Sequence, residues 1–291
     1  MLVAKNRADL AKILESGTFS GSSQALVPTM GALHTGHLSL VDVAKTHAER
    51  VSASIFVNPK QFSPSEDYDQ YPRAEQDDLE KLEAAGVDLV YTPGPADMYP
   101  NGHDTQISVG AVAQPLDGVS RPHFFAGVAT VVAKLFTRMR PHAAIFGEKD
   151  YQQLLVIRRM AEDLDLGVKV VGAPIVRERD GLAMSSRNRY LTPPERRIAG
   201  ELNVVMRKIC GRIAGGVAVP TALIQGMQEM DSVGLHPVDY LELRSSTDLQ
   251  PTPERELRRD EMEDARLFAA VMLGNTRLID NMAVLEAAAL S

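Results

Sequence analysis

The stretch Pro28-Thr29-Met30-Gly31-Ala32-Leu33-His34-Thr35-Gly36-His37 places two histidines and two glycines where a strand-like run gives way to a helical pattern. Residues 24–27 form a short, largely apolar run, and from Gly36 onward apolar residues recur at helical spacing. The first turn of a helix leaves backbone N–H groups without intrahelical partners and carries a partial positive charge. The stretch is therefore typical of a site for an anionic ligand such as a polyphosphate.

The glycines and histidines of this stretch suit such a ligand. Gly31 can adopt backbone angles that are closed to other residues, and Gly36 has no Cβ, so a flat group can approach its backbone closely. His34 and His37 are three residues apart and share a face once the helix has begun. Each can donate to phosphate oxygens or move a proton near neutral pH. The alternative, a pair of surface or capping histidines, is disfavoured by the strand-to-helix context.

Length, charge and composition are those of a globular chain. With 291 residues, 44% of them hydrophobic, the chain can bury the core of one large domain or of two smaller ones. The 31 lysines and arginines are outnumbered by 38 aspartates and glutamates, and the net charge of −7 argues against a nucleic-acid partner. No apolar run approaches the roughly 18 residues of a membrane span, so we expect no membrane partner.

The N-terminal residues and the single cysteine bear on location. Residues 1–17 read as an amphipathic helix without the features of an export signal. Cys210 cannot form an internal disulfide, and its simplest interpretation is a buried, small apolar side chain. Both observations fit a cytoplasmic protein.

Strand-like and helix-like segments alternate along the first part of the chain. The strand-like runs are residues 24–27, 51–57, 87–91, 143–146 and 169–171, and the helical patterns are residues 36–48, 75–85, 125–139 and 151–164. This alternation predicts an α/β fold, a Rossmann-like parallel sheet with helices on both faces. Ligands of such sheets bind beyond the carboxyl ends of the strands, where residues 30–37, 58–61 and 147–150 all fall.

The pattern changes in the C-terminal part of the chain. Thr192-Pro193-Pro194-Glu195 combines a capping box with a proline at the first helical position, and predicts a helix that runs toward Cys210. Candidate strands at residues 238–243, 267–272 and 277–281, with a turn at Gly274-Asn275, predict a smaller α+β domain. We expect domains at residues 1–176 and 177–291, and a solvated loop or linker at residues 251–264.

Five blocks of sequence together resemble one known family. They are the stretch from Pro28 to His37, Phe56-Val57-Asn58-Pro59-Lys60-Gln61-Phe62, Phe146-Gly147-Glu148-Lys149-Asp150-Tyr151-Gln152-Gln153, Met184-Ser185-Ser186-Arg187-Asn188, and Leu273-Gly274-Asn275-Thr276-Arg277-Leu278-Ile279-Asp280. The first resembles the His-x-Gly-His signature of the nucleotidyl-transferring α/β superfamily. In this order, over nearly the whole chain, the five blocks resemble the pantothenate synthetase (pantoate–β-alanine ligase) family.

The resemblance implies an activity and its substrates. Members of this family condense (R)-pantoate with β-alanine to form pantothenate, the precursor of coenzyme A. The reaction uses ATP, passes through a pantoyl adenylate and releases AMP and pyrophosphate. The resemblance further implies Mg²⁺ as the companion of ATP, a homodimer, and a second domain that covers the active site. A nucleotidylyltransferase of the same fold is the alternative, and a catalytically silent ATP-binding or regulatory protein is another.

Residue roles follow from the resemblance, position by position. The expected catalytic residues are His37 as proton donor, His34 mainly as a phosphate ligand, and Lys149. The expected ATP contacts are Met30, Gly31, Ala32, Leu33, His34, Thr35, Gly36, His37, Gly147, Glu148, Lys149, Asp150, Val176, Met184, Ser185, Ser186 and Arg187. Gln61, Gln153 and Asn58 are expected to bind pantoate and β-alanine. No carboxylate cage is visible, so no metal ligand is assigned.

Several of these roles also have a basis in side-chain chemistry. The ammonium of Lys149 lies just beyond a strand, where it can reach a phosphate as a point charge. Ser185 and Ser186 have no adjacent base in the sequence, so they read as hydrogen-bond donors rather than nucleophiles. Asp150 suits either a ribose hydroxyl or the cap of the helix that begins at Tyr151. The amides of Asn58 and Gln61 can orient hydroxyl groups without adding charge.

One block departs from the family pattern. Residues 120–127, Ser120-Arg121-Pro122-His123-Phe124-Phe125-Ala126-Gly127, match the family's Arg-Pro-Gly-His-Phe-Arg-Gly form imperfectly. The histidine comes one position early, at His123, and Ala126 stands where the family has arginine. No role is therefore assigned to His123, although Phe125 and Gly127 still fit the start of a helix near the substrate.

Overall fold

The computed structural model describes residues 1–17, 19–63 and 67–289, whose contacts divide the chain into two compact units, residues 1–174 and 175–291. The first unit contains the strands β1 (Leu2–Ala4), β2 (Gln24–Thr29), β3 (Arg50–Ile55), β4 (Leu89–Tyr91), β5 (Ala143–Gly147) and β6 (Lys169–Ala173). Its helices are α1 (Arg7–Glu15), α2 (Thr35–Lys45), α3 (Glu75–Ala84), α4 (Pro95–Met98), α5 (Asp117–Ser120), α6 (Phe124–Met139) and α7 (Tyr151–Asp163). Short 3-10 helices lie at η1 (Pro59–Gln61), η2 (Ala111–Ala113) and η3 (Glu148–Asp150).

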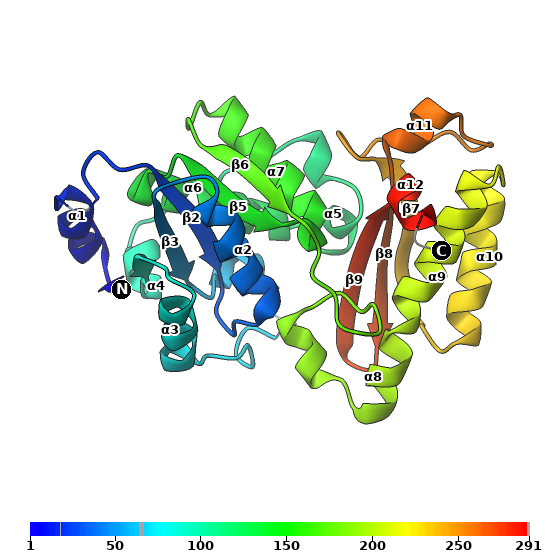
Figure 1. Ribbon diagram of the computed structural model, residues 1–291, viewed down its shortest axis with the longest axis horizontal. Helices are drawn as coiled ribbons and strands as arrows, with labels where there is room; N and C mark the ends of the chain where they lie inside the picture. Colours follow the sequence, from blue (N-terminus) through cyan, green and yellow to red (C-terminus); the bar gives the residue numbers. More distant parts are fainter. Residues whose placement is uncertain (18, 64–66, 290–291) are drawn as a thin grey trace. The chain divides into compact units, whose positions relative to one another are not determined.

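The strands of the first unit form one parallel sheet in the order β1-β4-β3-β2-β5-β6. Figure 1 labels the strands β3, β2, β5 and β6 of this sheet. From β2 the chain proceeds to β3 and β4 on one side, then returns to place β5 and β6 on the other side. The strand order therefore reverses between β2 and β5, and such a switch point is where open α/β sheets bind ligands. The Rossmann-like fold predicted from the alternating segments is confirmed.

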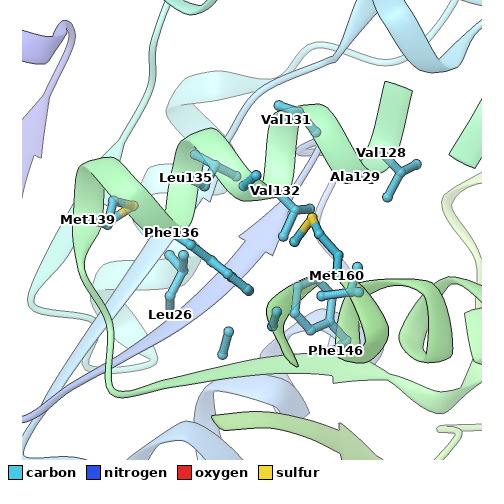
Figure 2. Close-up of a cluster of buried hydrophobic side chains, with 14 of the residues drawn as sticks. Leu26, Val128, Ala129, Val131, Val132, Leu135, Phe136, Met139, Phe146 and Met160 are labelled. Carbon is cyan, nitrogen blue, oxygen red and sulfur yellow. The ribbon is translucent and has the colours of Figure 1, made fainter. Parts of the chain in front are cut away.

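Side chains of the strands alternate between two hydrophobic cores. In β2, Leu26 packs into a core with α1, α6 and α7, whereas Ala25 and Val27 pack into another core with α2 and α3. Figure 2 shows the first core, where Leu26 and Phe146 of the sheet meet Phe136 of α6. Helices therefore cover both faces of the sheet.

The second unit is built on an antiparallel sheet. Its strands β7 (Val238–Ser245), β8 (Ala265–Leu273) and β9 (Thr276–Ala283) pair in the order β7-β8-β9. Its helices are α8 (Pro193–Ala199), α9 (Glu201–Ala214), α10 (Val219–Ser232), α11 (Arg259–Glu263) and α12 (Val284–Ala288), with a 3-10 helix η4 (Ser186–Tyr190). One hydrophobic core, with Ile209, Cys210 and Leu267 fully buried, joins the sheet to α9, α10 and α12. The predicted α+β architecture of this part is confirmed.

Three local predictions need correction. Residues 1–17 do not form a single helix, because Leu2–Ala4 pairs with β4 as an edge strand before α1 begins. The helix that starts at the Thr192 capping box ends at Ala199, and α9 follows after Gly200. An added Cβ at Gly200 would lie 2.8 Å from Oδ2 of Asp180, so this break packs closely against a neighbouring loop. Residues 251–264 contain the helix α11 rather than only a loop.

The division after Pro174 lies near the domain boundary expected at Val176. Among the described residues, none of the helices is both long and apolar enough to cross a bilayer.

Candidate active site

Three loops with polar, functional side chains leave the carboxyl ends of adjacent strands in the first unit. The His34–His37 stretch follows β2, Asn58 and Gln61 follow β3, and η3 follows β5. Since β3, β2 and β5 are neighbours in the parallel sheet, all three loops leave it at the same edge. The switch point between β2 and β5 lies between the histidines and Lys149.

The two histidines are held by the backbone of their own helix start. His34 is the N-cap of α2, and its Nδ1 accepts the backbone N–H of Gly36 at 3.1 Å. Nδ1 of His37 accepts the backbone N–H of His34 at 3.3 Å, and the two ring centroids are 4.1 Å apart. In a neutral imidazole whose Nδ1 is an acceptor, the proton is on Nε2. Both rings are thus oriented as Nε2–H donors.

Burial and neighbouring cations keep His37 neutral. Burial lowers the pKa of His37 from 6.5 to about 3, and electrostatic interactions with His34, Lys149 and Lys81 act in the same direction. A neutral ring with its proton on Nε2 can donate a hydrogen bond through that nitrogen. The expected role of His37 as proton donor stays a prediction.

The loop before the histidines has an unusual backbone. Gly31 and Ala32 both have positive φ angles, +84° and +53°. Two backbone N–H groups of this loop, those of Ala32 and Leu33, donate to the buried carboxylate of Asp78 on α3 at 2.8 and 2.7 Å. In addition, Nζ of Lys81 donates to the carbonyl oxygen of Leu33 at 3.0 Å.

Asn58 and Gln61 form a linked pair. Asn58 is 1% exposed, and its Nδ2 donates to Oε1 of Gln61 and to the carbonyl of Gly127, each at 3.1 Å. Its Oδ1 accepts from the hydroxyl of Tyr99 at 2.7 Å and from the backbone N–H of Lys60 at 3.3 Å. The amide of Asn58 is therefore fully used in orienting its neighbours, and the predicted direct contact of Asn58 with substrate stays a prediction.

Gln61 joins two of the three loops. Its Nε2 donates to Sδ of Met30 at 3.2 Å, and its backbone carbonyl accepts from Arg121 at 3.2 Å. The start of α6 packs directly on η1, since a Cβ at Gly127 would lie 2.2 Å from the carbonyl oxygen of Lys60. Phe125 and Gly127 lie in the first turn of α6, as predicted, whereas His123 is exposed. Their predicted place near the substrate stays a prediction.

The loop after β5 presents Lys149 and Asp150. Nζ of Lys149 lies 3.5 Å from Oδ1 of Asp150, and the lysine side chain is 20% exposed. Asp150 is at the N-cap position of α7 but makes no side-chain capping bond, so the capping alternative is not realised. Gly147 lies beside α2, where a Cβ would be 4.0 Å from Leu40.

Two consecutive glutamines of α7 differ in their use. Both amide atoms of Gln152 make hydrogen bonds within the protein. Its Oε1 accepts from the backbone N–H of Asp117, and its Nε2 donates to the carbonyls of Val112 and Pro115. Gln153 is partly buried, and its side chain makes no hydrogen bond among the described residues. Its amide remains available for a ligand, and the predicted contact of Gln153 with substrate stays a prediction.

The remaining predicted ATP contacts lie in the second unit. The backbone N–H of Met184 donates to the carbonyl of Val176 at 3.0 Å, so these two predicted residues are neighbours. Oγ of Ser185 accepts from the backbone N–H of Arg187 at 3.2 Å and caps η4. This cap is the ordinary structural role of such a serine. The predicted contacts of Val176, Met184, Ser185, Ser186 and Arg187 with ATP stay predictions.

Sequence reasoning missed four residues that hold the site together, namely Asp78, Lys81, Tyr99 and Arg121. Asp78 had one recognisable signal, because it precedes the buried Leu82 by four residues and therefore lies on the apolar face of α3. Acidic residues are common in the first turn of a helix, where their charges are favourable. Asp78 was therefore not distinguished from its acidic neighbours Glu75 and Asp77. Tyr99 lies in an irregular segment and carries no such signal, whereas Arg121 belongs to the block of residues 120–127 that partly matches the family pattern.

Comparisons with known proteins show the family of the chain. The family described as Pantoate-beta-alanine ligase matches residues 2–283 of the chain. The chain belongs to this family. Pantothenate synthetases from Caulobacter vibrioides and Rhodospirillum rubrum are 48% and 49% identical to it, and each alignment covers 97% of this chain and 98% of the relative.

Solved structures of pantoate–β-alanine ligases share the fold. A crystal structure of pantothenate synthetase from Thermus thermophilus is 43% identical, with a TM-score of 0.90, and the match covers 98% of this chain and 99% of that one. A pantoate-beta-alanine ligase from Francisella tularensis, described as complexed with beta-gamma ATP and beta-alanine, is 33% identical with a TM-score of 0.82. That match covers 98% of both chains.

Proposed function

We propose that this chain, an ATP-dependent pantoate–β-alanine ligase, joins its substrates through a pantoyl adenylate formed at the carboxyl edge of the parallel sheet. One observation carries the proposal. The Nε2–H groups of His34 and His37 are fixed at the N-terminus of α2, and Lys149, which follows the adjacent strand β5, is close enough to lower the pKa of His37. This donor set suits a triphosphate.

The first proposed step activates the carboxylate of pantoate. A carboxylate oxygen attacks the α-phosphorus of ATP, the bond to the β-phosphate oxygen breaks, and pyrophosphate leaves. Negative charge develops on the phosphate oxygens, where His34, His37 and Lys149 donate hydrogen bonds or supply positive charge. Donors that are already oriented cost no reorganisation, and each contributes about 3 to 4 kcal/mol to the stability of the transition state.

The second proposed step forms the amide bond. The amine of β-alanine attacks the acyl carbon, the bond to the phosphate oxygen breaks, and AMP leaves while the amine loses a proton. Gln61 and Gln153 are the proposed binding residues for pantoate, and Gln61 also for β-alanine. The support for Gln61 is the fixed plane of its amide, held by Asn58 and Met30.

ATP is proposed to bind as its Mg²⁺ complex. Within the described ranges, no group of three or more His, Cys, Asp or Glu side chains is arranged to hold a metal ion. The imidazole and ammonium groups at the sheet edge are not the oxygen ligands that Mg²⁺ prefers. The phosphate oxygens of ATP are therefore the proposed ligands, and the bound ion would neutralise part of their charge.

The test separates the ligase from a nucleotidylyltransferase of the same fold. With purified protein, exchange of labelled pyrophosphate into ATP is expected to require pantoate but not β-alanine. The complete reaction is expected to release free AMP and pantothenate. A product that retains the nucleotide would favour the nucleotidylyltransferase. ATP binding by calorimetry, without turnover of pantoate and β-alanine, would favour a silent ATP-binding protein.

The contribution of the second unit is tested separately. We propose that Ser185, Ser186 and Arg187 donate to the triphosphate, and that Met184 and Val176 contact the nucleotide. Ser186→Ala and Arg187→Ala are expected to raise the KM for ATP more than the KM for β-alanine. Equal KM values for ATP in the variants and the parent protein would remove these residues from the ATP site.

Two further proposals are a homodimer, which rests on the family resemblance alone, and a cytoplasmic location, which rests on the N-terminal residues and the single cysteine. Light scattering of the purified protein measures the mass of the particle in solution, and a value for a single chain would contradict the dimer. Fractionation of cells measures the location.

A further inference from the structure

The carboxylate of Asp78 is buried under the loop that precedes the two histidines. Asp78 is 1% exposed, and its two oxygens accept the backbone N–H groups of Ala32 and Leu33 at 2.8 and 2.7 Å. A buried carboxylate is costly unless hydrogen bonds replace its lost water. Here the donors are the amides of the loop itself, so the charge of Asp78 and the shape of the loop depend on each other.

The loop needs such support because its backbone is strained. Ala32 has a φ of +53°, a left-handed conformation that costs a residue with a side chain roughly 1–2 kcal/mol. Gly31, with a φ of +84°, packs against the same carboxylate, and a Cβ there would lie 2.9 Å from Oδ2 of Asp78. The two hydrogen bonds of Asp78 therefore hold a turn that the chain would not adopt alone.

Lys81, one turn further along α3, extends this support to the histidines. Its Nζ donates to the carbonyl oxygen of Leu33 at 3.0 Å and also lies 2.6 Å from Oδ2 of Asp77. That carbonyl belongs to the same peptide unit as the N–H of His34, which donates to Nδ1 of His37. A single planar peptide unit thus connects α3 to the ring of His37.

We propose that Asp78 and Lys81 are positioning residues for the imidazole pair. Asp78 fixes the turn, Lys81 fixes the carbonyl end of the Leu33–His34 peptide, and the N–H end of that peptide fixes Nδ1 of His37. The result is a His37 ring whose Nε2–H points in one direction before ATP binds. The consequence for catalysis rests on the proposed function, whereas the consequence for the ring does not.

The kinetic test uses Asp78→Asn, which keeps the shape of the side chain but replaces one acceptor by an NH₂ group. Its kcat for pantoate-dependent pyrophosphate exchange is expected to fall about tenfold to a hundredfold, as for a catalytic group displaced by a fraction of an ångström to an ångström. The KM for pantoate is expected to change less than threefold. Glu80→Gln, an exposed acid on the same helix, is the matched control and should retain the parent kcat.

The second readout is the ring itself. In protein labelled with ¹⁵N-histidine, the parent is expected to show His37 as the neutral tautomer with its proton on Nε2. Asp78→Asn and Lys81→Met are expected to shift or broaden the Nδ1 and Nε2 signals, and Lys81→Arg to restore them in part. Circular dichroism tests whether each variant is folded. If Asp78→Asn does not fold, Lys81→Met provides the test. The Lys81 side chain is 36% exposed, so its replacement is expected to leave the fold intact.

The outcomes distinguish the two proposals. A folded Asp78→Asn or Lys81→Met variant with the parent kcat and unchanged His37 signals would overturn the positioning role. A parent protein without pantoate-dependent exchange would overturn the proposed function, and the His37 signals would still decide whether Asp78 and Lys81 orient the ring.

Discussion

The hydroxyl of Tyr99 donates a hydrogen bond to Oδ1 of Asn58 at 2.7 Å, and Nδ2 of Asn58 donates in turn to Oε1 of Gln61. A tyrosine outside all five sequence blocks therefore sets the orientation of the amide beside the proposed substrate site. The ring of Tyr99 is itself held between Phe56 and His103, with centroids 6.2 and 5.0 Å away.

Tyr99→Phe is expected to loosen this chain of hydrogen bonds. Loss of one hydrogen bond to a buried acceptor costs about 1 kcal/mol of unfolding free energy, measured by urea denaturation. The kcat/KM for pantoate is expected to fall about fivefold to tenfold for the same reason. Tyr240→Phe, in the second unit, is the control for loss of a hydroxyl elsewhere. Equal kcat/KM values in Tyr99→Phe and the parent would show that Gln61 does not depend on Tyr99.

The neutral state of His37 predicts a dependence of stability on pH. In the folded protein the pKa of His37 is about 3, below the ordinary value of 6.5, so the unfolded chain binds the proton more strongly between these values. The contribution of His37 is therefore present above pH 6.5 and is lost as the pH falls toward 3. The free energy of unfolding, measured by urea denaturation at a series of pH values, is expected to decline more steeply in the parent than in His37→Gln. His123→Gln, at an exposed histidine, should keep the slope of the parent.

Removal of the phosphate donors is expected to slow the first chemical step. His37→Ala and Lys149→Ala should reduce the single-turnover rate of pantoyl adenylate formation by roughly 10² or more, with an intact fold, because each removes a preoriented group from the transition state. Lys169→Ala, at an exposed lysine of β6, is the control. Parent rates in His37→Ala or Lys149→Ala would exclude that residue from the mechanism.

The absence of a Cβ at Gly127 allows α6 to pack against the loop that carries Gln61. A Cβ at this position would meet the backbone of Lys60 and Gln61 at 2.2 to 2.9 Å, so Gly127→Ala must displace η1. We expect a loss of about 1–3 kcal/mol of unfolding free energy and a raised KM for pantoate. At Gly94, where nothing lies within 4 Å of an added Cβ, the same substitution should change neither quantity appreciably.

An ion pair in the second unit predicts a large effect on stability. Asp280, 3% exposed, accepts from both terminal nitrogens of Arg177 at 2.6 and 2.9 Å and from the backbone N–H of Asn281 at 2.7 Å. Arg177→Met leaves this buried carboxylate without its cation and is expected to cost about 3–5 kcal/mol of unfolding free energy. The double variant Arg177→Met, Asp280→Leu should recover part of that loss in urea denaturation, and a double variant no more stable than Arg177→Met would contradict the account.

Regular segments with strong periodicity were predictable from the sequence. The long helices α6 and α7 and the central strands β2, β3 and β5 lie within a few residues of the predicted ranges, because their apolar patterns extend over one or more turns or over most of a strand. The strand β1 was missed, since three residues at a sheet edge carry no period and are defined only by their pairing with β4. The break at Gly200 was missed because it depends on contact with Asp180.

The sequence by itself determined the order of the long helices and central strands, the family, and the residue types available to a triphosphate, since these depend on local patterns and on motifs that are contiguous in the chain. Only the tertiary structure decided which nitrogen of His37 carries its proton, which of Gln152 and Gln153 has an amide left for a ligand, and that Asp78 and Lys81 hold the turn before the histidines. The roles of Gln152, Asp78 and Lys81 arise from hydrogen bonds between segments far apart in the chain, which no local pattern encodes. The proton position in His37 follows from a hydrogen bond within its own helix start, and its neutral state follows from burial in the folded chain.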